Sequence, residues 1–376
     1  MTARFGRLLA AALAIVLLLA APARAFDPPY LILDMDTGDV LAQRDAGELW
    51  YPASLTKLMT VYIVFQALRD GRLGLDSPIT MTAAATAEPP ARMGFSEGTV
   101  ITVDNALKIL MVKSANDVAV AVAENIAGSV TAFVSEMNRQ AAFLGLSGTR
   151  FVNPHGLPAS GQSTTARDMA MLGLALWQQF PEYRSYFGIS AIQYRETVMP
   201  TPNALLDFYR GANGMKTGYI CSAGYNLVAT ATRAGHTLLV TLLGESSIES
   251  RAIRAAQLFD GGFGLVATSP RIPISGFAPV SSVTAPVDRR PEICPPGAPP
   301  DGEIADERVL TAAIGPRLGL TSPVVVATGG ANMDRPILSN VPLPRAKPPL
   351  PPDALGLATA PPAATGVPLP RPRPGV

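Results

Sequence analysis

The sequence has few of the side chains that build metal sites or disulfide frameworks. Its 376 residues include two histidines and two cysteines, and these are not spaced as pairs of zinc ligands. Charged residues make up only 16%, and 30 Lys and Arg side chains nearly balance 29 Asp and Glu. A net charge of +1 without a long basic run is not the electrostatic footprint of a nucleic-acid-binding protein. We therefore expect no metal, no cofactor and no nucleic-acid partner.

Long hydrophobic runs are also scarce, and the one that stands out is at the N-terminus. Arg4 and Arg7 precede an apolar run over residues 8–21, and the triplet Ala-Arg-Ala follows at 23–25. This is the pattern of a secretory signal peptide, and the run is shorter than the about 20 residues that cross a bilayer. We predict that residues 1–25 are a cleaved signal peptide and that the mature chain has no clear membrane anchor. An uncleaved signal anchor is the alternative.

Proline divides the chain into two compositional regions. Of the 36 prolines, 24 lie between residues 270 and 374. Proline lacks a backbone N–H and fixes φ, so this composition favours extended polyproline II over packed elements. We predict a folded domain over residues 26–265, a small β-rich module or linker over 266–330, and a disordered Pro-rich tail over 331–376.

Within residues 26–265, hydrophobic periodicity predicts an α/β domain. Alternation around short turns predicts one β-hairpin at the start of the domain and another near its end, followed by a helix. Apolar residues at intervals of three or four predict helices between the hairpins. The strands are expected at 31–36, 39–44, 225–232 and 237–243, and the helices at 54–68, 103–111, 116–126, 130–144, 165–179 and 250–260. The simplest assembly is an antiparallel sheet from both chain ends with an inserted helical lobe, and active sites often lie where two such lobes meet.

A serine and a lysine one helical turn apart form the first candidate site. Ser54 lies at the start of a predicted helix, and Lys57 follows on the same face. A serine hydroxyl becomes a nucleophile when a nearby base removes its proton, and a lysine can be that base if burial or a second cation lowers its pKa. Of the five lysines in the chain, only Lys57 has a serine three positions before it. A helix cap beside a solvated lysine is the alternative interpretation.

Two further short motifs follow in the sequence. Ser114-Ala-Asn116 is the only Ser-x-Asn triplet and lies between two predicted helices. Lys216-Thr217-Gly218 precedes the strand predicted from residue 225, where Lys216 offers a cation and Gly218 would allow close approach of a substrate backbone. Taken singly, the Ser-x-Asn triplet is also compatible with an ordinary helix cap. The Lys-Thr-Gly triplet is also compatible with a lysine in a loop.

The order Ser-x-x-Lys, Ser-x-Asn, Lys-Thr-Gly matches the signature of penicillin-binding proteins and serine β-lactamases. Over roughly residues 28–265 the chain resembles the serine D-alanyl-D-alanine carboxypeptidases, the low-molecular-mass penicillin-binding proteins. Phrases similar to that family's also occur in its usual order at 33–38, 51–54, 114–117, 151–157, 164–168 and 223–225. The resemblance implies a β-lactamase/DD-peptidase-like fold and makes residues 26–265 the catalytic domain.

The resemblance also implies roles for individual residues. Ser54 would be the acylated nucleophile and Lys57 its general base, while Ser114 would relay a proton to the departing amine. The backbone N–H groups of Ser54 and Tyr219 would form the oxyanion hole, and Asn116 would hydrogen-bond the substrate amide. Such oxyanion donors are typically worth about 3 kcal/mol each.

The same resemblance implies a pocket for the free C-terminal carboxylate of the substrate. Thr217, Lys216 and Arg251 would form it, with Arg254 as a rival for the arginine position. Arginine suits this role because its planar guanidinium binds carboxylates in a bidentate manner. His155, in Asn-Pro-His-Gly, is interpreted as part of a tight turn rather than as a catalytic group.

The chain departs from the family pattern at Cys221, where a small or hydroxylated residue is expected. In an oxidising compartment Cys221 and Cys294 can form a disulfide, but sequence does not give the distance between them. Pairing and two free thiols both remain open.

The resemblance implies hydrolysis of the terminal D-Ala-D-Ala bond of peptidoglycan stem peptides, with β-lactam antibiotics as covalent inhibitors, in the periplasm or cell envelope. A β-lactamase-like hydrolase is one alternative, although no glutamate between residues 116 and 216 lies in a Glu-x-x-Leu-Asn phrase that would activate a deacylating water. A non-catalytic wall-binding protein with the same fold is a second alternative. The balance between carboxypeptidase and transpeptidase activity is left open.

Overall fold

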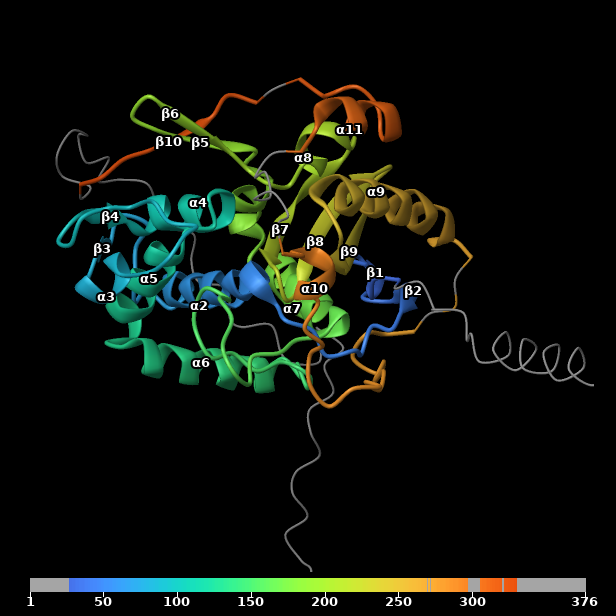
Figure 1. The fold of residues 1–376 in the computed structure, drawn as a ribbon, viewed down its shortest axis with the longest axis horizontal. Coiled ribbons are helices and arrows are strands. Elements are labelled where there is room, and N and C mark those ends of the chain that lie inside the picture. The colour runs from blue at the N-terminus through green and yellow to red at the C-terminus, as the bar shows by residue number, and fades with distance from the viewer. Residues whose placement is uncertain (1–26, 269, 271, 297–304, 320, 330–376) are drawn as a thin grey trace, which may run out of the picture.

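A five-stranded antiparallel sheet built from both ends of the domain forms one half of the molecule (Figure 1). The computed structural model describes residues 27–268, 270, 272–296, 305–319 and 321–329, so the predicted signal peptide and Pro-rich tail lie outside the described residues. The sheet order is β2-β1-β9-β8-β7. Its strands are β1 (Tyr30–Asp34), β2 (Val40–Arg44), β7 (Ala212–Ile220), β8 (Gly224–Arg233) and β9 (His236–Glu245).

Alternating side chains of the central strands bury both faces of the sheet. On β9, Leu238, Val240 and Leu242 belong to the core beneath helix α9 (Ile248–Leu265), whereas Leu239 and Leu243 belong to the core shared with the helices on the other side. Helix α7 (Ala166–Gln179) packs against β9 from that second side. Because successive side chains of a strand point to opposite faces, the sheet can pack between two helical layers.

The helical lobe lies beside the β7 edge of the sheet (Figure 1). It contains η1 (Ala53–Thr56), α2 (Lys57–Arg69), α3 (Ala83–Thr86), α4 (Val103–Val112), α5 (Asn116–Ala127) and α6 (Val130–Phe143), with the short strands β3 (Pro78–Thr80) and β4 (Val100–Thr102). Helix α2 is buried almost all round, which explains why its sequence is apolar on every face. No single helix of the described chain has the length and hydropathy to cross a membrane, although α5 and α6 taken together, bent by 87°, meet the length and composition test.

The predicted hairpins and helices are present with bounds shifted by a few residues, and the α/β fold prediction is confirmed. The prediction placed Lys216-Thr-Gly before a strand, but it lies inside one: β7 pairs Lys216 with Val228 and Gly218 with Asn226. Glycine and polar residues hide this strand because they interrupt its apolar alternation. Within residues 26–265, the short elements β3, α3 and β4 were not predicted, nor were η2 (Pro181–Gly188), β5 (Ala191–Tyr194), β6 (Thr197–Pro200) and α8 (Leu205–Phe208).

The described part of 266–330 runs along the domain that precedes it in the chain. Residues 272–274 bond to the β1–β2 hairpin, and α10 (Arg290–Ile293) leads to Cys294, which forms a disulfide with Cys221. Helix α11 (Glu307–Ala313) packs on α9, while β10 (Val324–Val326) pairs in parallel with β5. The one strand described in this range thus joins β5 and β6 of the preceding domain and does not form a separate β-rich sheet. The domain boundaries themselves stay a prediction.

The loop at residues 153–157 packs closely against η1. Gly156 has φ +93°, and a Cβ there would lie 1.8 Å from the main-chain oxygen of Ala53. Only glycine fits, both because the conformation is left-handed and because no space exists for a side chain. The loop is thereby held directly beneath the segment that carries Ser54.

We predict that Gly156→Ala lowers the free energy of unfolding by about 3 kcal/mol or more, because left-handed strain adds to a backbone collision. Gly161→Ala is the matched control: its φ is +82°, but the nearest atom to a Cβ is Arg150 Nε at 3.7 Å. It should cost about 1–2 kcal/mol, the conformational term alone. Chemical denaturation measures both variants, and equal losses would contradict this account of the loop.

Candidate active site

Ser54 and Lys57 lie together at the junction of η1 and α2. Lys57 Nζ is 3.0 Å from Ser54 Oγ, 2.8 Å from Asn116 Oδ1 and 2.9 Å from the main-chain oxygen of His155. The Lys57 side chain is fully buried. Three separate segments therefore converge on one amine.

The three contacts are ones that a neutral amine can make, as an ammonium ion also could. A neutral amine has two N–H donors and one lone pair. The Asn116 amide is oriented by its own Nδ2, which donates to the Pro89 carbonyl at 3.0 Å, so Oδ1 faces Lys57 as an acceptor. A carbonyl oxygen also only accepts, whereas the Ser54 hydroxyl can donate. Neutral Lys57 can thus donate to Asn116 and His155 and direct its lone pair at Ser54.

The surroundings of Lys57 favour this neutral form. Burial lowers the pKa of Lys57 well below its ordinary value, and the nearby charge of Lys216 lowers it further. The carboxylates of Asp117 and Glu88 act in the opposite direction. The candidate base therefore has the depressed pKa that removal of a serine proton near neutral pH requires.

Ser114 and Asn116 follow the end of α4 and begin α5. Ser114 is buried with φ +61°, and its Oγ has no hydrogen-bond partner among the described residues. The Asn116 side chain accepts a hydrogen bond from Lys57 and donates one to the Pro89 carbonyl, so its contacts in the structure orient the lysine. Its predicted contact with the substrate amide stays a prediction, as does the proton relay through Ser114.

Lys216 on strand β7 and Arg251 on helix α9 form a buried cationic pair. Their side chains are 1% and 3% exposed, and burial together with the charge of Arg251 lowers the pKa of Lys216 to about 7. Burial lowers the pKa of Arg251 to about 10. Arg254 instead pairs with Asp27 at 3.0 Å, so the structure places Arg251, and not its rival, beside Lys216.

Gly218 allows β7 to approach Ser54. A Cβ at Gly218 would lie 2.9 Å from the Ser54 backbone nitrogen and 3.1 Å from that of Leu55. Gly218 was predicted to allow close approach of a substrate backbone. In the structure it allows close approach of the protein's own backbone at Ser54 and Leu55. Because β7 is the edge strand, it has only one strand neighbour, and the Gly218–Tyr219 backbone lies next to the Ser54 segment as the predicted oxyanion hole requires. The donor role of Tyr219 stays a prediction.

Sequence reasoning missed two groups that position the site. The His155 main-chain oxygen accepts a hydrogen bond from Lys57, although the side chain itself was correctly placed in a turn. The fully buried Asn226 donates to the Tyr51 oxygen at 2.9 Å and accepts from the Gly244 N–H, which ties β8 and β9 to the segment before Ser54. Neither contact has a spacing signature, because one is a backbone atom and the other joins residues 175 positions apart.

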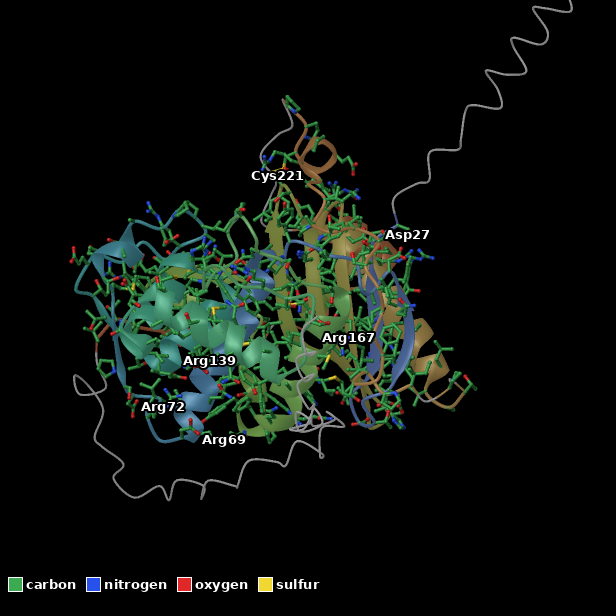
Figure 2. The ribbon with its side chains drawn as sticks, turned by 90° about the horizontal axis from the view of Figure 1, so that it is seen from below. Asp27, Arg69, Arg72, Arg139, Arg167 and Cys221 are labelled. Atoms are coloured by element: carbon green, nitrogen blue, oxygen red, sulfur yellow. A yellow bond between two sulfur atoms is a disulfide. The ribbon has the colours of Figure 1, made fainter. Side chains whose placement is uncertain are left out.

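The side chain of Tyr219 connects β7 with the disulfide. Its ring stacks on Tyr225 at 4.3 Å, and its hydroxyl lies 3.0 Å from Cys294 Sγ. Figure 2 shows Cys221 at the end of the sheet, beyond strands β7 and β8. The structure thus answers the open question about the two cysteines: they pair, next to the candidate site. Across the described residues, no group of three or more His, Cys, Asp or Glu is arranged to hold a metal ion.

The buried charge of Lys216 should cost stability. Its pKa of about 7 in the folded protein lies below about 10.4 in an unfolded chain, so the unfolded state binds the proton more tightly. The cost is full below pH 7 and is lost as pH rises toward 10. We predict that Lys216→Met raises the free energy of unfolding at pH 6.5, on the order of 1–3 kcal/mol, and that this gain shrinks at pH 9.5.

Urea denaturation at the two pH values measures this effect. Lys108→Met is the control, because that side chain is 19% exposed and paired with Asp104; its effect should be nearly equal at both pH values. If Lys216→Met destabilised the protein equally at both, the charge of Lys216 would not carry the cost assigned to it.

Comparisons with known proteins agree with the geometry of the site. Residues 22–247 match the family model of the D-alanyl-D-alanine carboxypeptidases. The chain is 38% identical over 241 residues to D-alanyl-D-alanine carboxypeptidase DacC of Escherichia coli K12, a match that covers 62% of this chain and 60% of that relative. The chain thus spans about three fifths of the length of this and similar curated relatives.

Solved structures show the same fold. Penicillin-binding protein 5 from Haemophilus influenzae superimposes with a TM-score of 0.61 at 32% identity, over 65% of this chain and 73% of that one. Penicillin-binding protein D2 from Listeria monocytogenes, in its cefotaxime-bound form, gives 0.57 at 26% identity, over 62% of this chain and 96% of that one. By sequence match and by fold, this chain belongs to the D-alanyl-D-alanine carboxypeptidase family.

Proposed function

We propose that this chain is a serine carboxypeptidase that removes the terminal D-Ala from peptidoglycan stem peptides ending in D-Ala-D-Ala. The observation that carries the proposal is the contact of 3.0 Å between Ser54 Oγ and the buried Lys57 Nζ, whose other two partners leave the lone pair to the serine. A solvated lysine beside a helix cap would be exposed, and a degenerate wall-binding protein would have no need of a fully buried amine.

In the proposed acylation step, Lys57 takes the Ser54 proton while Oγ attacks the carbonyl carbon of the penultimate D-Ala. The negative charge that develops on the carbonyl oxygen is stabilised by the backbone N–H groups of Ser54 and Tyr219. The C–N bond then breaks, and the leaving amine of D-Ala receives a proton by way of Ser114. Attack of water on the Ser54 ester, with Lys57 again as base, releases the shortened peptide.

The proposed carboxylate pocket explains why two buried cations are retained. Among the described residues, neither Lys216 nor Arg251 forms an ion pair with a carboxylate, and the Arg251 guanidinium donates to the Pro202 carbonyl at 2.6 Å. A substrate carboxylate would supply the missing negative charge, together with a hydrogen bond from Thr217. Binding of that anion would raise the pKa of Lys216.

β-Lactams mimic the D-Ala-D-Ala end of such a peptide, and we propose that they inhibit this protein by acylating Ser54 and remaining attached to it. We also propose export to the periplasm or cell envelope by the predicted signal peptide, where stem peptides are found. The Cys221–Cys294 disulfide supports export, because disulfides persist in oxidising compartments.

Intact-mass spectrometry after incubation with benzylpenicillin tests the proposal directly. We predict a mass increase of one penicillin per chain that persists for many minutes and is absent in Ser54→Ala. Ser185→Ala, an exposed serine on η2, is the matched control and should be labelled like the wild type. Rapid hydrolysis without a lasting adduct would instead indicate a β-lactamase, and no reaction at all would indicate a binding protein.

Recognition of the free carboxylate gives a second prediction. Arg251→Ala should raise KM for a D-Ala-D-Ala peptide at least about tenfold, because a buried charge-assisted hydrogen bond is worth about 1.5–3 kcal/mol. Arg254→Ala should stay within about twofold of the wild type, since that arginine pairs with Asp27. The same peptide with an amidated C-terminus should lose little further in Arg251→Ala; a similar loss for both peptides would show that Arg251 acts on the fold and not on the carboxylate.

A further inference from the structure

Glu88 is an acidic side chain beside the site to which the proposed reaction assigns no role. It follows helix α3, on the loop whose carbonyl at Pro89 orients Asn116. Its side chain is 23% exposed, and its Oε2 lies 3.3 Å from Nε2 of His155. Glu88 thus joins the loop after α3 to the loop at residues 153–157.

The ring nitrogen of His155 that faces the Glu88 carboxylate, Nε2, carries a proton. Its Nδ1 accepts a hydrogen bond from the Leu157 N–H at 3.1 Å, so the proton of a neutral ring is on Nε2. Burial, and the nearby charge of Lys57, lower the pKa of His155 to about 3, so the ring is neutral at ordinary pH. His155 therefore connects Glu88 to the loop without carrying charge itself.

The main chain of the same residue contacts the base. His155 O accepts from Lys57 Nζ at 2.9 Å, and its position is fixed on both sides: Gly156 N–H donates to Asn153 Oδ1 at 2.7 Å, and Thr60 Oγ1 donates to the Pro154 carbonyl at 2.6 Å. A carboxylate that holds the ring of His155 also limits movement of its carbonyl. A continuous series of contacts therefore runs from Glu88 to Lys57.

The titratable groups that face Lys57 come from four parts of the chain. Lys216 on β7 opposes protonation of Lys57, whereas Asp117 on α5 and Glu88 favour it; His155 is neutral. The carboxylate of Asp117 accepts from the backbone N–H groups of Met93, Gly94 and Val118, so it has a structural task of its own. Within the part of the chain that the structure describes, no backbone N–H donates to the Glu88 carboxylate, so Glu88 is the acid whose charge can be removed with least disturbance.

We propose that Glu88 is a positioning residue for the general base: its carboxylate holds the His155 ring, and so the carbonyl that Lys57 donates to, while its negative charge offsets part of the effect that burial and Lys216 have on the Lys57 amine. A base must be neutral to accept the serine proton, yet an amine depressed too far by burial and Lys216 would accept it weakly. Glu88 offsets part of that depression. The inference rests on the proposed function of Lys57, but its first test does not require activity.

The first test reads Lys57 directly by NMR. The chain contains five lysines, so labelling with lysine enriched in 13C at Cε gives few resonances, and that of Lys57 is assigned by its absence in Lys57→Arg. Glu88→Gln should lower the titration midpoint of Lys57 by roughly one pH unit, because a nearby negative charge is lost. Glu97→Gln, an exposed acid on the same loop, should leave it in place. A Lys57 resonance unchanged by Glu88→Gln at every pH down to acid unfolding overturns the electrostatic part.

The second test separates position from charge through the pH profile of acylation by a fluorescent penicillin. Glu88→Gln should move the acid limb to lower pH and leave the alkaline rate within about threefold of wild type, because an amide oxygen can still accept from His155 Nε2. Glu88→Ala should show the same shift and lose about tenfold more at alkaline pH, where Lys57 is neutral in every variant. Equal alkaline rates for the two variants overturn the positioning part. If the wild type is not acylated at all, the proposed function fails, while the NMR shift still decides the charge effect.

Discussion

The site depends on one lysine that is kept out of water. Burial of Lys57 disfavours its ammonium form, and the two obligate acceptors beside it use the N–H groups of a neutral amine, so the lone pair is directed at Ser54. Neither effect would be enough alone: burial without oriented acceptors gives a neutral amine pointing anywhere, and acceptors in water would simply bind an ammonium ion. The fold supplies both because four chain segments meet at this point.

Two glycines and one buried asparagine bring those segments together. Gly156 lets the loop at residues 153–157 contact the Ser54 segment, and Gly218 lets strand β7 do the same. At both positions a Cβ would collide with the main chain of that segment. Asn226 then bonds the residues preceding Ser54 to the middle of the sheet. The proposed nucleophile, Ser54, is thus held by main-chain contacts from both lobes, which is the kind of support that keeps reacting atoms within a few tenths of an ångström.

Much of this arrangement could be predicted from sequence, and the limits have physical causes. Ser54 and Lys57 are one helical turn apart, and the serine and asparagine of the Ser-x-Asn motif are two residues apart. Such short spacings can be recognised in the sequence because local geometry alone brings the side chains close together. The hairpins and long helices follow from periodicity. Strand β7 does not, because Gly214, Lys216 and Gly218 break its alternation, and its place at the sheet edge depends on long-range pairing with β8. The contribution of His155 was hidden for a simpler reason: its carbonyl is a group that every residue has. The pairing of the cysteines needed coordinates.

The disulfide shows how the C-terminal segment is connected to the proposed carboxylate pocket. Cys294 brings the chain after α10 to the end of β7, where its sulfur receives the Tyr219 hydroxyl. Tyr219 stacks on Tyr225, and the Arg251 guanidinium lies 5.7 Å from the centre of that second ring. An arginine over an aromatic face is stabilised without neutralisation of its charge, so Arg251 can be held in place and still attract an anion. A carboxylate contact within the protein would orient Arg251 equally well but would compete with the substrate. The stacked tyrosines avoid that competition, and the covalent link at Cys221 anchors the strand end on which they depend.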